Sequence, residues 1–298
     1  MSLDKRFRAG TIAIVGRPNV GKSTLLNALV GQKLAITSRK PQTTRHRLAG
    51  ILTREGVQFV FVDTPGFQTR HRGALNRVLN RRVRDTLEGV DVVLFVVEAG
   101  RLRAEDQAVV RLLPENVPVV LVVNKADLLP EPARMMPFLA TASTWFPFAA
   151  VVPLSAAKKR NLAPLLDAIA PLLPQQPPLF DADALTDRSE RFLAAELLRE
   201  KLFRLLGDEV PYGSAVAIEK FAEEGALRHI HAAIVVDKPG HKSIVIGRGG
   251  EKLKEIASAA RRDMETLFGG KVFLEVWVKV RTGWTESEAA IRSLDETS

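Results

Sequence analysis

The sequence predicts an α/β domain built on a mainly parallel sheet, followed by a smaller α+β domain. Three observations support this fold class. Short apolar segments alternate with helical segments through the first half, a glycine-rich loop follows the first apolar segment, and a proline cluster precedes a change of pattern. The length of 298 residues fits two domains at about 150 residues each.

Five apolar segments of the first half are expected to be strands. Their apolar residues run on without alternation, which indicates a sheet buried on both faces. The first segment stops at Gly16, and a helix is expected to follow over Ser23–Val30. Helical segments between the others are typical of parallel crossovers. The expected strands are Thr11–Val15, Val57–Val62, Val92–Val97, Val119–Val123 and Ala150–Leu154.

Four prolines between Pro171 and Pro178 mark a boundary, because such a stretch cannot continue a helix and is typical of a semi-rigid linker. One long loop inside a single domain is the alternative, but the pattern changes beyond it. We expect a first domain at 1–173, a linker at 174–188, a second domain at 189–284 and an acidic tail at 285–298. The later elements are expected at Ser189–Leu206, Ser214–Phe221, His229–Asp237, Glu251–Phe268 and Lys271–Val280.

Composition excludes several classes of protein. The chain has no cysteine, so disulfide frameworks and thiol chemistry are excluded. No apolar run approaches the roughly 20 residues that cross a bilayer, and the charged start is not a signal peptide. Net charge is +9, with 25 basic and 13 acidic residues up to position 173 and 18 against 21 beyond it. A polyanionic partner is a reasonable first hypothesis.

A phosphate-binding loop is predicted between the first strand and the first helix, where the sequence matches GxxxxGK[ST]. Backbone N–H groups and the helix N-terminus favour phosphate there. Lys22 is expected to reach the β- and γ-phosphates and Ser23 to bind Mg²⁺. The residues expected at the nucleotide are Gly16, Arg17, Pro18, Asn19, Val20, Gly21, Lys22, Ser23 and Thr24.

The base is predicted to be guanine. Asn124, Lys125 and Asp127 form NKxD directly after an expected strand. The Asp127 carboxylate can accept hydrogen bonds from guanine N1–H and the 2-amino group, which adenine lacks. Asn124 would tie this loop to the phosphate loop, and the stem of Lys125 would cover the base. The backbone of Ser155, Ala156 and Ala157, after the last expected strand, could meet the guanine O6.

Two further segments are expected around the γ-phosphate and the metal. Asp63, Thr64, Pro65 and Gly66 form DTPG after a strand, with Asp63 placed to bind Mg²⁺ through water. In Gln42–Arg45 one threonine would complete the Mg²⁺ shell; we choose Thr44 and hold Thr43 in reserve. Lys22, Thr44 and Gly66 are therefore the expected catalytic residues.

The position after Gly66 is occupied by Phe67, whereas Ras-like enzymes place a water-orienting glutamine there. Gln68 is a weak substitute. Hydrolysis is therefore expected to be slow. A run of six arginines from Arg70 to Arg84 follows, and it fits equally a solvated helix face or a nucleotide-controlled contact.

A second glycine-rich loop predicts nucleic-acid binding. Its GxxG sequence leads into an expected helix, in the order helix, strand, strand, GxxG, helix, strand, which matches a type II KH domain. Such a loop clamps about four nucleotides, and lysines flank it here. The residues expected at RNA are Lys242, Ile246, Gly247, Arg248, Gly249, Gly250, Lys252 and Lys254.

Taken in order, GRPNVGKS, QTTR, DTPG, NKAD and SA resemble the TrmE–Era group of translation-factor-related GTPases. In the second half, TDRSERF, REK, EVPY and VIGRGG are similar to the Era branch of that group, so the resemblance spans about 7–284. It implies a Mg²⁺-dependent GTPase with a KH domain. It also implies that the KH domain binds the 3′ end of 16S rRNA and that the protein acts in 30S subunit assembly.

Two alternatives remain. One is a constitutive RNA-binding structural factor whose nucleotide serves stability alone. The other is a membrane-associated regulator, whose contact would be peripheral and electrostatic because no amphipathic anchor or lipidation motif is evident. We expect a cytoplasmic monomer that binds no DNA.

Overall fold

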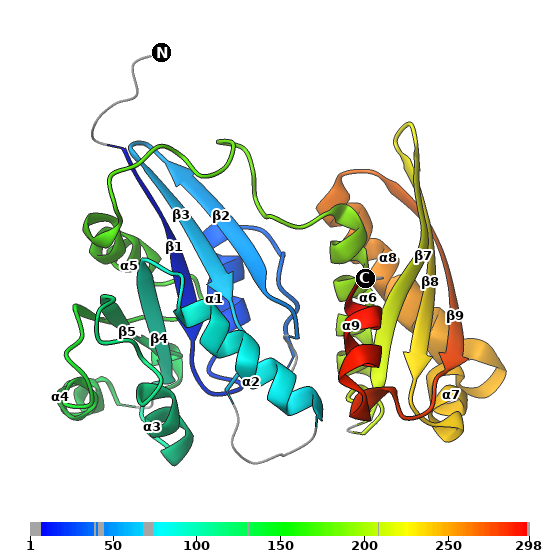
Figure 1. The fold of residues 1–298 in the computed structure, drawn as a ribbon, viewed down its shortest axis with the longest axis horizontal. Helices are drawn as coiled ribbons and strands as arrows, with labels where there is room; N and C mark the ends of the chain where they lie inside the picture. Colours follow the sequence, from blue (N-terminus) through cyan, green and yellow to red (C-terminus); the bar gives the residue numbers. More distant parts are fainter. Residues whose placement is uncertain are drawn as a thin grey trace. The chain divides into compact units, whose positions relative to one another are not determined.

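The computed structural model describes residues 7–38, 40, 45–67, 74–129, 131–207 and 209–296, with 74–76, 132, 292, 295 and 296 described by backbone alone. The chain folds into two compact units (Figure 1). The first extends to Asp187, and the second runs from Arg188 onward with two short segments from earlier in the chain.

The first unit is built on a six-stranded sheet with strand order β2-β3-β1-β4-β5-β6. β2 runs antiparallel to β3, and the other neighbouring pairs are parallel. The carboxyl ends of the parallel strands therefore meet at one edge, where α/β proteins place their ligands. The strands are β1 (Arg8–Val15), β2 (Leu48–Arg54), β3 (Val57–Asp63), β4 (Val92–Glu98), β5 (Val119–Asn124) and β6 (Ala150–Pro153).

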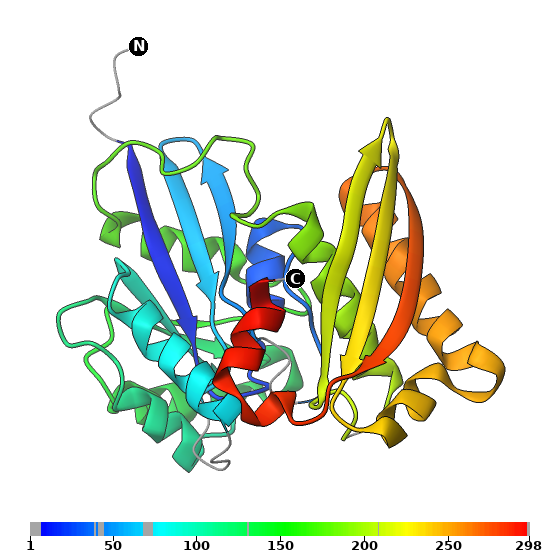
Figure 2. The same ribbon diagram turned by 45° about the vertical axis from the view of Figure 1, so that its right-hand side comes forward.

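Helices cover both faces of this sheet (Figure 2). On one face α2, α3 and α4 pack against alternate strand residues, including Val15, Phe95 and Leu121, in one apolar cluster. Because both faces are buried, the strands are mainly apolar, as the sequence predicts. The helices are α1 (Lys22–Val30), α2 (Ala74–Leu87), α3 (Ala104–Val110), α4 (Met135–Ser143) and α5 (Leu162–Ile169), with the short turns η1 (Ala126–Leu128), η2 (Pro132–Arg134) and η3 (Ala170–Leu172).

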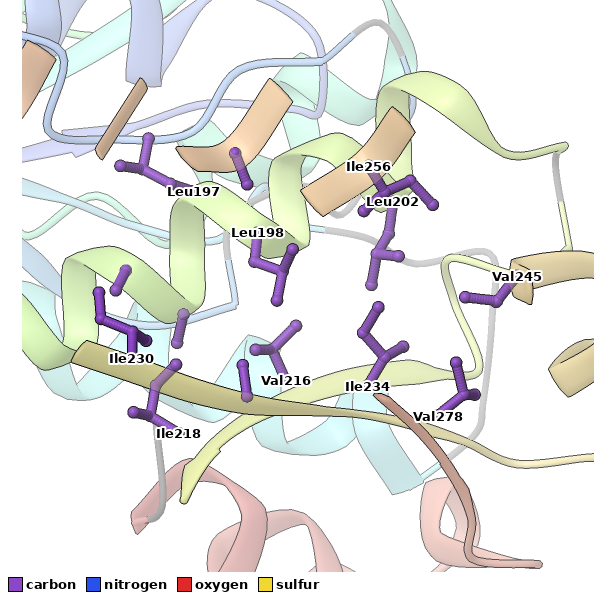
Figure 3. Packing of buried hydrophobic residues seen from close by; sticks show 14 of the residues in the cluster. Leu197, Leu198, Leu202, Val216, Ile218, Ile230, Ile234, Val245, Ile256 and Val278 are labelled. Atoms are coloured by element: carbon purple, nitrogen blue, oxygen red, sulfur yellow. The ribbon is translucent and has the colours of Figure 1, made fainter. Parts of the chain in front are cut away.

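The second unit is a three-stranded sheet with strand order β7-β8-β9. β7 and β8 are antiparallel, whereas β8 and β9 are parallel. One face packs on α6 and α8, and Figure 3 shows Leu198, Val216 and Ile234 meeting in that core. The elements are α6 (Glu190–Leu205), β7 (Ser214–Glu224), β8 (Leu227–Val236), α7 (Pro239–Ile246), η4 (Arg248–Gly250), α8 (Glu251–Phe268), β9 (Lys271–Val280), η5 (Trp284–Glu286) and α9 (Glu288–Glu296).

The segment expected as a linker packs along the first unit instead of standing apart from it. Gln58, fully buried in β3, explains this packing. Its Oε1 accepts from the N–H groups of Leu179 and Phe180 at 2.8 and 3.0 Å, and its Nε2 donates to the Phe180 carbonyl at 2.8 Å. A buried side-chain amide that pairs both its ends fixes the backbone it contacts.

The expected acidic tail contains a helix, α9. α9 lies on the other face of the second sheet, where Ile291 and Leu294 form a small cluster with Ala215, Val235 and Trp284. The apolar stripe on one side of α9 therefore outweighs its acidic composition. Among the described residues, no helix is both long and apolar enough to span a bilayer.

Candidate nucleotide site and RNA-binding loop

The predicted phosphate loop lies between β1 and α1, at the carboxyl edge of the sheet. Gly21 has a left-handed backbone, with φ of 100°, directly before α1 begins at Lys22. A side chain there would place its Cβ 2.4 Å from Asn124 Nδ2. Only glycine meets both requirements, so the phosphate loop can close against the NKxD loop.

Lys22 is held inside the phosphate loop. Its Nζ donates to the carbonyl oxygens of Gly16 and Arg17, each at 3.1 Å. Burial lowers the pKa of Lys22 to about 8, although nearby Asp63 acts in the opposite direction. The phosphates of a nucleotide would favour the charged form further.

Oxygen donors suited to Mg²⁺ meet beside the phosphate loop. Ser23 Oγ donates to Asp63 Oδ2 at 2.6 Å, and Asp63 is fully buried at the end of β3. Mg²⁺ is commonly held by one or two carboxylates together with substrate phosphates. Ser23 and Asp63 therefore fit a phosphate-bound Mg²⁺.

The DTPG segment adjoins the phosphate loop. Thr64 Oγ1 donates to the Ile14 carbonyl at 2.8 Å, which fixes the segment to β1. A Cβ on Gly66 would lie 2.9 Å from the backbone nitrogen of Pro18, so the two loops are in close approach. Gly66 therefore stands where a γ-phosphate contact is expected.

Asn124 joins three loops through one amide. Its Nδ2 donates to the Val20 carbonyl at 2.8 Å. Its Oδ1 accepts from the N–H groups of Lys125 at 2.8 Å and Ala156 at 3.0 Å. The phosphate loop, the NKxD loop and the segment after β6 are thus held together by one buried side chain.

The base-reading residues follow β5 and β6. Asp127 lies exposed in the short turn η1, and Lys125 before it has a left-handed backbone, with φ of 62°. The Ala126 N–H donates to the Leu154 carbonyl at 3.1 Å, which brings this turn to the end of β6. Ser155 and Ala156 are buried there, whereas Ala157 is exposed.

Two carboxylates escaped prediction from the sequence. Glu98, at the end of β4, and Asp106, in the first turn of α3, both contact the side chain of Arg17 in the phosphate loop. Neither belongs to a recurrent motif. The only local signal is that Asp106 occupies an acidic position typical of a helix start.

Thr44, chosen for the Mg²⁺ shell, lies outside the described residues, as do Thr43, Gln68, Arg70 and Arg72. Later in the arginine run, Arg82 donates to the Arg45 carbonyl, whereas Arg81 and Arg84 are exposed on α2.

Phe67 occupies the glutamine position as a member of the core. It is 8% exposed and clusters with Val15, Val83 and Phe95. We expect Phe67→Ala to lower the free energy of unfolding by about 3–5 kcal/mol, as truncation of buried Phe usually does. GTP turnover per folded molecule should fall far less than in Lys22→Ala, as measured by phosphate release well below the melting temperature. A comparable loss with intact GTP binding would instead make Phe67 a positioner of water or of the switch segment.

The predicted RNA loop connects α7 to α8. Gly247 has φ of 73°, and a Cβ on it would lie 2.6 Å from the Lys252 Cβ. Arg248 and Gly249 are exposed at the tip of the loop, and Gly250 directly precedes α8. The loop therefore offers backbone, one guanidinium and the start of an 18-residue helix to a phosphate chain.

The flanking residues differ in their availability. Lys242 and Lys254 are exposed, whereas Lys252 pairs with Glu255 at 2.7 Å. Ile246 is partly buried against the core of the second unit, and its neighbour Ile244 is 51% exposed. Of these two apolar side chains, Ile244 is therefore the more accessible to a bound base.

This fold and its sites define a P-loop GTPase that carries a KH domain. A family model described as a 50S ribosome-binding GTPase matches residues 11–125, and a KH domain model matches residues 209–285. The GTPase Era of Nitrosomonas eutropha is 57% identical over 288 residues, which is 97% of each chain. The chain therefore belongs to the GTPase Era family, and it is an enzyme that hydrolyses GTP to GDP and phosphate.

Solved structures agree over nearly the whole length. Aquifex aeolicus Era bound to GDP and AlF4− matches with a TM-score of 0.93 at 37% identity, covering 98% of this chain and 100% of that one. An Era in complex with MgGDPNP and nucleotides 1506–1542 of 16S ribosomal RNA matches with the same TM-score at 36% identity and the same coverage. The predicted fold class, a P-loop GTPase domain followed by a KH domain, is confirmed.

Proposed function

We propose that this chain is a GTP-controlled switch that binds the 3′ end of 16S rRNA and assists assembly of the 30S subunit. The observation that carries the proposal is the presence of a guanine-nucleotide site and an exposed GxxG loop on one chain. A similar Era is solved with a GTP analogue and the 3′-terminal nucleotides of that RNA together.

In this proposal each loop at the sheet edge has one task. Lys22 neutralises the β- and γ-phosphates, Gly66 contacts the γ-phosphate, and Asp127 reads guanine. Ser23, Thr44 and Asp63, the last through water, hold a Mg²⁺ ion that supplies Lewis-acid stabilisation of phosphate charge. Because Phe67 cannot orient water, the intrinsic rate is slow.

The KH loop supplies the RNA contact. The positive charges of Arg248, Lys242 and Lys254 attract the phosphate backbone of the RNA. Apolar surface for the bases comes from Ile244 and Ile246. We assign the residues from 189 to 284 to this domain and place α9 beside it.

We also propose a cytoplasmic monomer that binds single-stranded RNA and no DNA. Contact with the inner face of the membrane, if it occurs, is peripheral and depends on net charge. Sedimentation with anionic vesicles at low and physiological salt tests this contact. Binding that is present at low salt and lost at physiological salt agrees with the proposal, and any other result contradicts it.

Nucleotide control is tested by titrating a 3′-terminal 16S rRNA fragment with the protein in GTP-analogue, GDP and nucleotide-free solution. A switch binds the RNA with an affinity that depends on the nucleotide. Equal affinity in all three solutions would instead support the constitutive RNA-binding factor.

Guanine specificity depends on Asp127. We expect Asp127→Asn to weaken GTP binding by about 10²- to 10⁴-fold and to strengthen xanthosine triphosphate binding, because the amide donates where the carboxylate accepted. Competition against a fluorescent nucleotide measures both. Asp167→Asn, at an exposed position of α5, is the matched control and should change neither. If the unaltered protein bound ATP and GTP equally, the guanine assignment would fail.

A further inference from the structure

A charged cluster joins the phosphate loop to the base-reading loop through two carboxylates that lie outside the nucleotide motifs. It centres on Arg17, whose side chain is 6% exposed. Arg17 Nε lies 3.2 Å from Asp106 Oδ2, and Nη2 lies 2.9 Å from Glu98 Oε2. The same Glu98 oxygen lies 3.3 Å from Lys125 Nζ. One carboxylate therefore contacts both the phosphate loop and the base-reading loop.

The two carboxylates stand on regular elements. Glu98 ends β4 and is in register with Asn124 at the end of β5, so Lys125 follows directly beside it. Asp106 lies in the first turn of α3, where its Oδ2 also accepts from the Arg103 N–H at 3.0 Å. Side chains on a strand end and a helix start are held more firmly than those on free loops.

The cluster depends on charge. Burial alone would raise the pKa of Glu98, but hydrogen bonds from Arg17 and Lys125 outweigh it and lower that pKa. Burial raises the pKa of Asp106, and Arg17 offsets this only in part. Asp106 is fully buried, and its Oδ1 finds no hydrogen-bond partner among the described residues. Neutralising one member would leave a buried charge incompletely compensated.

Arg17 also helps to position Lys22, because the Arg17 backbone carbonyl accepts a hydrogen bond from Lys22 Nζ at 3.1 Å. We propose that Glu98 is a positioning residue for the nucleotide, which holds the phosphate loop through Arg17 and the base-reading loop through Lys125. Asp106 supports the phosphate loop through Arg17 and makes no link to Lys125 in the described structure. This inference rests on the nucleotide site proposed above and adds two residues that do not touch the ligand.

The test is the dissociation rate of a fluorescent GDP analogue from the full chain. Glu98→Gln keeps the shape and removes the charge, and we expect dissociation about tenfold faster. Asp106→Asn should accelerate it by a smaller factor. Glu131→Gln is the matched control, since Glu131 forms an exposed ion pair with Arg134 at 2.9 Å in the same unit, and its rate should equal that of the unaltered protein.

Double variants separate positioning from general stability. When Lys125→Ala is combined with Asp106→Asn, the two accelerations of dissociation should multiply. When it is combined with Glu98→Gln, the extra acceleration should be smaller than that of Lys125→Ala alone, because Glu98 acts partly through Lys125. A purely structural role would lower the melting temperature of Glu98→Gln and leave dissociation from folded protein unchanged.

An unchanged dissociation rate in Glu98→Gln overturns the proposal. So does a double variant of Glu98→Gln and Lys125→Ala in which the two accelerations of dissociation multiply fully. If Glu98→Gln does not fold, Glu98→Asp replaces it, since the shorter carboxylate cannot span both cations and should also speed dissociation. Failure of the unaltered protein to bind GDP would refute the nucleotide site itself, which is a different outcome.

Discussion

Replacing Lys22 by alanine is expected to lower GTP turnover by about a thousandfold, the upper range for loss of one preorganised charge stabiliser. The fold should survive. Among the described residues, Lys22 donates to two loop carbonyls, each contributing about 1 kcal/mol. Its pKa is lowered from 10.5 to about 8 by burial, so its charge costs roughly 3 kcal/mol of stability at pH 7.

The sign of that cost is testable. A lysine whose folded pKa lies below its unfolded value destabilises the fold fully below about pH 8, and the penalty fades as pH rises toward 10.5. Lys22→Ala should therefore melt no lower than the unaltered protein at pH 7.

Phosphate release at saturating GTP checks the turnover, and a thermal melt of the same preparation without nucleotide checks the stability, because bound GTP would itself raise the melting temperature. Arg54→Ala, an exposed cation at the end of β2, is the control and should turn over GTP normally. Normal turnover in Lys22→Ala would remove this loop from the catalytic site.

The second large effect is expected at the KH loop, where changing Arg248 and Gly249 together to aspartate should weaken RNA binding by at least about 100-fold. The change converts one positive charge to two negative charges at the tip of the loop, where phosphates must approach. Both residues are exposed, and a Cβ on Gly249 meets nothing within 4 Å. Its φ of 59° is one that Asp tolerates better than most residues, so folding should persist.

A titration with a short single-stranded RNA measures this loss, and a phosphate-release assay on the same variant should show unchanged intrinsic hydrolysis. Arg262→Asp, an exposed charge reversal in the middle of α8, controls for net charge and should bind RNA nearly normally. The affinity of the unaltered protein should fall as salt rises, because phosphate contacts release counterions. RNA binding at full strength in the double variant would leave the arginine run from Arg70 to Arg84 as the better candidate.

The nucleotide loops could be predicted because each depends on a short stretch placed directly after a strand. Once the strands ending near Val15, Asp63 and Asn124 run parallel in one sheet, their loops must meet at the carboxyl edge of that sheet. The chemical roles of Lys22 and Asp127 can then be predicted from their residue types alone.

The features that escaped prediction depend on contacts between distant residues. Gln58 holds the proline-rich segment to β3, and nothing in the sequence pairs it with Phe180. β2 contains Ala49 and Gly50, which weaken its strand pattern, and α7 begins with Pro239 and Gly240, which are residue types typical of turns and loops. Glu98 has its partner Arg17 81 positions away.

Asn124 has a consequence for engineering the specificity of this enzyme. Both lone pairs of its amide oxygen are taken by backbone N–H groups, and its nitrogen serves the Val20 carbonyl. It therefore assembles the site, and one of its two amide N–H groups is left that could contact the base. A variant made orthogonal to cellular GTP should be sought by changing Asp127, while Asn124 stays fixed. Even Asn124→Asp would replace the amide donor by an oxygen acceptor that faces the Val20 carbonyl. The hydrogen bond that ties the phosphate loop to the other two loops would be lost, whatever ligand the variant was meant to bind.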